Sequence, residues 1–106
     1  MPKNVITLET AQAWADRFNK DRAIMTGVKA FTIPGSNVRE VMVEGVVDVR
    51  AYFGINDESE ATLMIVGVDK DGNDLIDEGH GFYIYDFSRP CPNSCNKKEP
   101  FINSLK

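Results

Sequence analysis

The run from Thr62 to Val68 constrains the fold more than any other part of the sequence, because it is the most apolar stretch of the chain. Side chains of a β-strand alternate between its two faces, and in this run both faces are apolar. One face would carry Thr62, Met64, Val66 and Val68, and the other would carry Leu63, Ile65 and Gly67. Strands that are apolar in both directions are usually covered on both sides. The run therefore predicts a central strand that needs a cover on each face.

Two helices are predicted before this strand. Thr7 is a good N-cap, and the apolar residues that follow it recur at the three- and four-residue spacing of a helix. These residues are Leu8, Ala11, Trp14 or Ala15, and Phe18. A second, shorter helix should follow the turn at 34–36 and end before Gly45, since apolar residues again have helical spacing there.

The remaining β-branched and aromatic segments predict further strands at 29–33, 46–53, 73–76 and 82–87. A hairpin loop with Gly72 at positive φ should precede the third of them. After Pro90 the sequence has little periodicity, which favours an irregular C-terminal tail. These elements predict one α+β domain over residues 1–106, in which two helices pack on a mainly antiparallel sheet of about four or five strands.

Composition narrows the classes of function. Hydrophobic residues make up 42% of the 106 residues and charged residues 26%, as in globular proteins. Twelve Lys and Arg against sixteen Asp and Glu give a net charge of −4, which argues against a nucleic-acid partner. The apolar runs are too short to predict a membrane span. The segment Met1–Thr7 lacks the features of a secretory signal, so we expect a cytoplasmic protein.

An acidic loop invites comparison with the EF-hand calcium loop. Its first three ligand positions are matched by Asp69, Asp71 and Asn73. Asp74 occupies the position that needs glycine, and His80 occupies the position of the bidentate glutamate. We therefore expect an acidic hairpin tip without a specific calcium site, and loose metal binding over 69–80 is the alternative.

Cys91 and Cys95 have the C-x3-C spacing that one ligand pair of a zinc site can adopt. A tetrahedral site needs two more ligands, which His80 and a carboxylate or a second molecule could supply. Reduced structural thiols and a local disulfide are the other interpretations of this pair. We predict no cofactor.

His80 is the one residue whose ordinary pKa suits general base catalysis near neutral pH. It lies between Gly79 and Gly81, where a catalytic group would be poorly held. A dyad with Cys91 is conceivable because a thiol nucleophile needs a neighbouring base, but no local motif supports it. The sequence favours a protein that is not an enzyme.

Four segments together resemble a group of short bacterial proteins of unassigned function. The segments are Arg50–Gly54, Thr62–Asp69, Asn73-Asp74 and Cys91–Cys95. The resemblance covers most of the chain after the first helix, and it implies no activity, cofactor or catalytic residue.

The 46–53 strand offers a candidate recognition surface. One of its faces would carry Val47, Val49, Ala51 and Phe53, and we expect this face to meet the helices. The other face would carry Val46 together with two opposite charges and an aromatic residue, namely Asp48, Arg50 and Tyr52. We predict binding residues on this second face and, in the last strand, at Tyr83 and Tyr85.

These features predict a small non-catalytic binding or assembly module that recognises a second copy of itself, as a homodimer, or another protein. The alternative is a metal- or thiol-dependent accessory protein that uses the acidic loop or the cysteine pair. Since two short helices can hardly cover both faces of the sheet, we expect either the C-terminal tail or a symmetric dimer to shield the second face. The tail would use Phe101, Ile102 and Leu105, and the dimer would place Arg50 and Tyr52 at the contact.

Overall fold

The structure is a computed structural model, and it describes residues 4–25, 28, 30–87 and 90–91. It confirms the predicted fold class, because two α-helices pack on a five-stranded antiparallel sheet. Cys95 and the apolar residues of the C-terminal tail lie outside the described residues, so the proposed cover by the tail lies there as well.

Helix α1 (Leu8–Lys20) begins where the sequence predicts. The side chain of Thr7 accepts a hydrogen bond from the Thr10 amide at 3.1 Å, as an N-cap does. Of its periodic apolar residues, Ala11 and Trp14 are buried in the core. At its other end the amide of Asp21 closes the last turn by donating to the Arg17 carbonyl at 2.9 Å.

The sheet has the order β1-β6-β4-β3, and every pair of neighbours is antiparallel. β4 (Ala61–Val68) is central, as its two apolar faces predict. β3 (Asp48–Ile55) pairs with the whole length of one side of β4. Two strands pair with the other side of β4, namely β6 (Ile84–Phe87) and β5 (Asp74–Leu75). β6 in turn pairs with β1 (Val5–Ile6) on its far side.

The other described elements are short. α2 spans Gly35–Val41, and single 3-10 turns occupy Arg22–Met25 and Glu78–His80. β2 (Ala30–Phe31) pairs with β7 (Pro90–Cys91) in a separate two-stranded sheet. Gly72 has a φ of 83°, as the hairpin prediction requires. Among the described residues, none of the helices is both long enough and apolar enough to cross a membrane.

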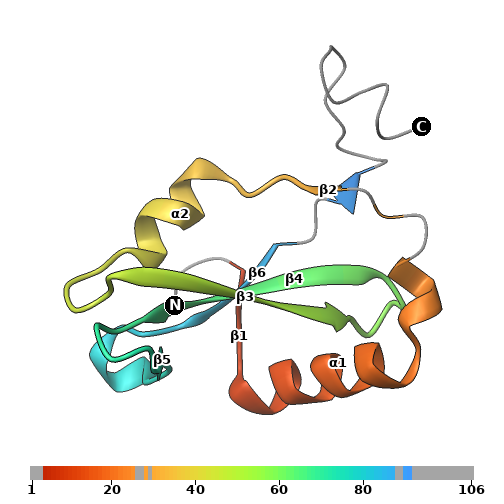
Figure 1. Cartoon of the computed structure of the whole chain (residues 1–106), viewed down its shortest axis with the longest axis horizontal. Helices are drawn as coiled ribbons and strands as arrows, with labels where there is room; N and C mark the ends of the chain where they lie inside the picture. Colours follow the sequence, from red (N-terminus) through yellow and green to blue (C-terminus); the bar gives the residue numbers. More distant parts are fainter. Residues whose placement is uncertain (1–3, 26–27, 29, 88–89, 92–106) are drawn as a thin grey trace.

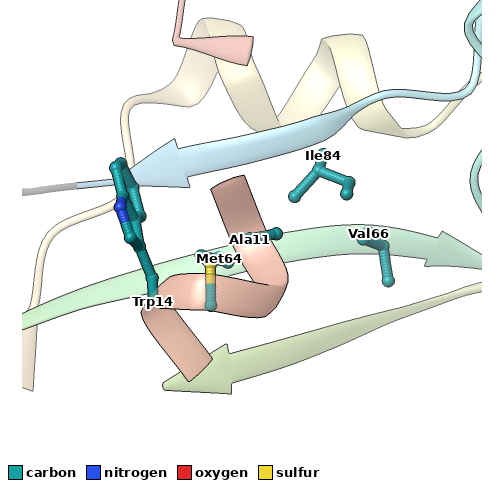
Figure 2. Packing of buried hydrophobic residues seen from close by; sticks show 5 residues of the cluster. All are labelled: Ala11, Trp14, Met64, Val66 and Ile84. Carbon is teal, nitrogen blue, oxygen red and sulfur yellow. The ribbon is translucent and has the colours of Figure 1, made fainter. Parts of the chain in front are cut away.

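The two helices lie on opposite faces of the sheet (Figure 1). The cluster under α1 joins residues of the helix to β4 and β6, and its side chains lie in the layer between helix and strands (Figure 2). This cluster consists of Ala11, Trp14, Met64, Val66 and Ile84. On the other face, Val41 of α2 packs with Ile65 and Tyr85. Each face of β4 therefore has its own helix. These two helices supply the cover that the sequence predicts for both faces of the central strand.

The prediction that Val47, Val49, Ala51 and Phe53 meet the helices holds only for Phe53, whose ring lies 5.3 Å from that of Phe18 in α1. The three larger side chains remain exposed, with fractions of 53% for Val47, 43% for Val49 and 48% for Phe53. The physical reason is that the longer helix, α1, takes the opposite face. α2 has only seven residues, and its buried Val41 packs on β4 and β6 instead of the edge strand β3.

Candidate functional site

Strand β3 and the residue before it carry an apolar stripe on an edge of the sheet. We name the β3 stripe the four residues Val47, Val49, Ala51 and Phe53, all of which are exposed. β4 pairs with one side of β3, and within the described part of the chain no strand pairs with its other side. An edge with unpaired backbone groups and apolar side chains is a template for pairing with another chain.

Helix α1 holds one end of β3 firmly. Gly54 and Ile55 are buried, whereas the six residues before them are exposed. The ring of Phe18 lies 5.3 Å from that of Phe53, between centroids, and the Arg22 guanidinium stacks on Phe18 at 5.4 Å. The C-terminal half of α1 therefore occupies this end of β3, and the accessible part of the edge is the stretch from 47 to 52.

Beyond this end, α1 also fixes the turn between β3 and β4. Arg17 Nη1 donates to the carbonyl of Asn56 at 2.8 Å and lies 3.0 Å from Asp57 Oδ1. The indole Nε1 of Trp14 donates to the same carboxylate oxygen at 3.2 Å. The turn is thus tied to the helix by three polar contacts.

A polar cluster lies on the α1 face of β3. Arg50 Nη1 and the hydroxyl of Tyr52 both donate to the carboxylate of Asp74, and Arg50 Nη2 donates to the Gly72 carbonyl at 3.2 Å. The hydrogen bond to Asp74 raises the pKa of Tyr52, and partial burial raises it further. Ionised tyrosine would lose this bond and would place two negative charges side by side.

The structure thus brings two of the predicted binding residues together through a third residue. Asp74 was not predicted, because its position beside β4 depends on the hairpin register, in which it pairs with Val68. Asp48 lies on the same face but is exposed, and no hydrogen bond or ion pair joins its side chain to the rest of the described chain.

The two predicted tyrosines of the last strand lie elsewhere. Tyr85 is only 2% exposed and belongs to the core between α2 and the sheet. Tyr83 packs against it edge-on, with ring centroids 6.3 Å apart, and is half-buried. Burial raises the pKa of Tyr85, and the nearby charge of Glu40 raises it further. These two rings therefore contribute to packing and are not part of the exposed surface around β3.

Beneath α2 lie two polar groups that the sequence did not single out. Asn37 is 3% exposed, and its Nδ2 has no hydrogen-bond partner among the described residues. Oε2 of Glu40, one turn later in the helix, is also buried and has no hydrogen-bond partner among the described residues. The apolar spacing of this helix did not indicate them, because Val38 and Met42 are exposed and the buried side of α2 carries Asn37 together with Val41.

The acidic loop uses its first carboxylate to shape the turn. Oδ1 of Asp69 accepts hydrogen bonds from the amides of Asp71 and Asn73, each at 2.9 Å. The bond from Asn73 is the main cause that lowers the pKa of Asp69. Over residues 4–25, 28, 30–87 and 90–91, the structure contains no group of three or more His, Cys, Asp or Glu that could hold a metal ion.

The other residues that the sequence singled out are the histidine and the two cysteines. His80 Nδ1 is 2.6 Å from Asp77 Oδ2, and both side chains are exposed. The contact with His80 lowers the pKa of Asp77. The backbone of Cys91 pairs with Ala30, and Cys95 lies outside the described residues.

Comparison of the chain with protein-family models, with curated proteins and with solved structures gives no match. The proposals below depend on the geometry of the site alone.

Proposed function

We propose that the protein is a non-catalytic assembly module in which the free edge of β3 pairs with β3 of a second copy. The observation that carries this proposal is the β3 stripe, an exposed row of apolar side chains on an edge strand. Pairing would extend the sheet across two molecules and would place the stripes of both copies side by side.

Symmetry limits how two identical edges can pair. A two-fold axis perpendicular to the sheet joins antiparallel strands and keeps each face on its own side. Residues directly opposite each other then belong to the same face, so the axis must pass between one residue of β3 and the same residue of the second copy. The accessible stretch from 47 to 52 offers four positions with a neighbour on both sides, which are Asp48, Val49, Arg50 and Ala51.

Charge and sterics favour Val49 at the axis. Asp48 would then lie opposite Arg50 of the second copy, twice in each dimer, while Val47 would lie opposite Ala51. With Asp48 or Arg50 at the axis, two like charges would face each other, which is destabilising. With Ala51 at the axis, pairing would extend to residues 54 and 55, where α1 already packs. Arg50 has five donors, so it can bind a second carboxylate while it keeps Asp74.

Sedimentation velocity over a range of concentrations tests this proposal. We expect the native chain to shift from its monomer mass of 11.8 kDa towards twice that mass as its concentration rises. The short stretch of paired edge forms a contact well below the standard interface size, so the association should be weak. Asp48→Lys should hold the protein at the monomer mass, because the introduced ammonium group would then face the guanidinium of Arg50.

Glu58→Lys is the matched control, since it makes the same change of charge in the exposed turn at 56–60. It should associate as the native chain does. A native chain that stays monomeric at millimolar concentration would overturn the proposal, as would equal association of the two variants.

A further inference from the structure

A small pocket opens between α1 and the sheet, on the face opposite the β3 stripe. Its volume is about 180 Å³, and it is lined by four residues of α1 and six residues of the sheet region. The helix contributes Leu8, Ala11, Gln12 and Ala15, and the sheet side contributes Tyr52, Met64, Val66, Asp74, Ile76 and Ile84. The buried floor is visible in Figure 2, where Ala11, Met64, Val66 and Ile84 line the space between helix and strands.

Three large exposed side chains surround the mouth of this pocket. Leu8, Tyr52 and Ile76 have exposed fractions of 47%, 40% and 37%, and all three line the pocket. They lie on three different segments of the chain, whereas Met64, Val66 and Ile84 below them are at most 3% exposed. The result is an apolar depression with a closed floor and an open mouth.

We infer that this pocket binds a single aromatic ring that carries one hydrogen-bond donor, with phenol as its simplest example. The size of the space supports one ring. A buried cavity of about 150 Å³ with an apolar lining binds benzene, whereas pockets for drug-sized ligands start at about 300 Å³. The second ring of a fused or two-ring ligand would extend out of the mouth into solvent.

The polar groups at the pocket decide which end group the ring should carry. Tyr52 uses its hydroxyl proton in the bond to Asp74, so its oxygen offers lone pairs only. The Asp74 carboxylate is likewise an acceptor, and its charge is balanced by Arg50. Both groups therefore select a donor such as a hydroxyl, and they disfavour a carboxylate. Gln12, the third polar residue of the lining, is exposed and carries an amide that can donate or accept, so it accommodates a hydroxyl as well.

NMR titration of the full chain with phenol, toluene and benzoate tests the inference. We expect saturable shifts of Ala11, Ala15 and Ile84 amides with phenol. Toluene should bind about two- to tenfold more weakly because it lacks the donor, and benzoate more weakly than toluene. Absence of saturation with phenol, or tighter binding of benzoate, would overturn the inference.

Two pairs of variants locate the site. Ala15→Leu fills the pocket from a half-buried helix position and should abolish the phenol shifts, whereas Ala13→Leu adds the same atoms at an exposed position of the same helix and should not. Tyr52→Phe should reduce the preference for phenol over toluene, and Tyr83→Phe, on the other face of the sheet, should leave it unchanged. Circular dichroism checks that each variant is folded. Unchanged phenol binding by folded Ala15→Leu would contradict the inference, whether or not β3 pairs with a second copy.

Discussion

At the scale of single residues, Asp74 holds two side chains of β3 by accepting hydrogen bonds from Arg50 and Tyr52. Two side chains of β3 donate to its carboxylate, so a strand and the hairpin that follows β4 are joined by charge-assisted hydrogen bonds. These groups are partly exposed, and their contribution to stability is correspondingly modest. Their main effect is to fix the direction of Arg50 and Tyr52.

The raised pKa of Tyr52 predicts a pH dependence of stability. Because the folded state holds the neutral hydroxyl more tightly than the unfolded state does, the bond to Asp74 contributes fully below a pH of about 10. This contribution is lost as the pH rises through the folded pKa of Tyr52. We expect Tyr52→Phe to lose less stability than the native chain as the pH rises above about 10. Chemical unfolding at several pH values measures this.

Tyr83→Phe serves as the control for that experiment, because Tyr83 packs on the other face of the sheet. Tyr85 also has a raised pKa, so some alkaline loss should persist in every variant that retains it. Identical pH profiles for the native chain and Tyr52→Phe would show that the bond to Asp74 does not stabilise the fold.

At the scale of elements, α1 can approach the sheet closely because residue 54 of β3 is glycine. A Cβ at Gly54 would lie 2.8 Å from Met64 Cε and 3.1 Å from Trp14 Cβ. The helix and strand therefore meet with almost no space between them. This close approach also brings Phe18 to Phe53 and closes that end of β3.

Gly54→Ala should therefore destabilise the protein by about 1–3 kcal/mol, the usual range for overpacking a core. Gly35→Ala is the matched control at the start of α2. A Cβ there would meet only Arg39 Nη1 at 3.4 Å, and the control should be neutral or slightly stabilising. Thermal and urea unfolding give both values. A loss below about 0.5 kcal/mol for Gly54→Ala, the effect of an ordinary surface substitution, would mean that α1 moves away without cost.

The elements with strong periodicity could be predicted from the sequence. α1 follows from the spacing of Ala11 and Trp14 after the Thr7 cap, and β4 follows from its apolar run. Alternation from Asp48 to Ile55 correctly showed which side chains share a face, but it failed before the strand, where Val46 lies over Gly67 on the face of Val49. It could not show which face receives α1, because that choice depends on packing at Gly54 and on the short reach of α2.

The candidate site was accessible to sequence reasoning only in part. Arg50 and Tyr52 share a face because they are two residues apart on a strand. Their link to Asp74 depends on contacts across more than twenty positions of the chain, since the separations are 24 and 22 residues. Tyr85 looked like a surface aromatic in the sequence, and the cover that α2 gives it accounts for its burial.

At the scale of the whole molecule, each face of the central strand has its own helix, and the exposed apolar area is displaced to the edge strand β3. The two helices lie on opposite faces of the sheet (Figure 1), and nearly every residue of β4 is buried, whereas β3 is buried only at the end where α1 packs on it. In the proposed dimer, the edge that is least covered in one molecule becomes the centre of a sheet shared by two.

Mixing two charge variants tests the proposed pairing most directly. Asp48→Lys alone places two cations opposite each other, and Arg50→Glu alone places two carboxylates opposite each other, so each variant should be monomeric when circular dichroism shows it to be folded. In the mixture, the introduced lysine of one variant faces the introduced glutamate of the other, and the native Arg50 faces the native Asp48. The account predicts that sedimentation velocity of the equimolar mixture shows the heterodimer at twice the mass of 11.8 kDa. A mixture that sediments no faster than its two components would contradict it.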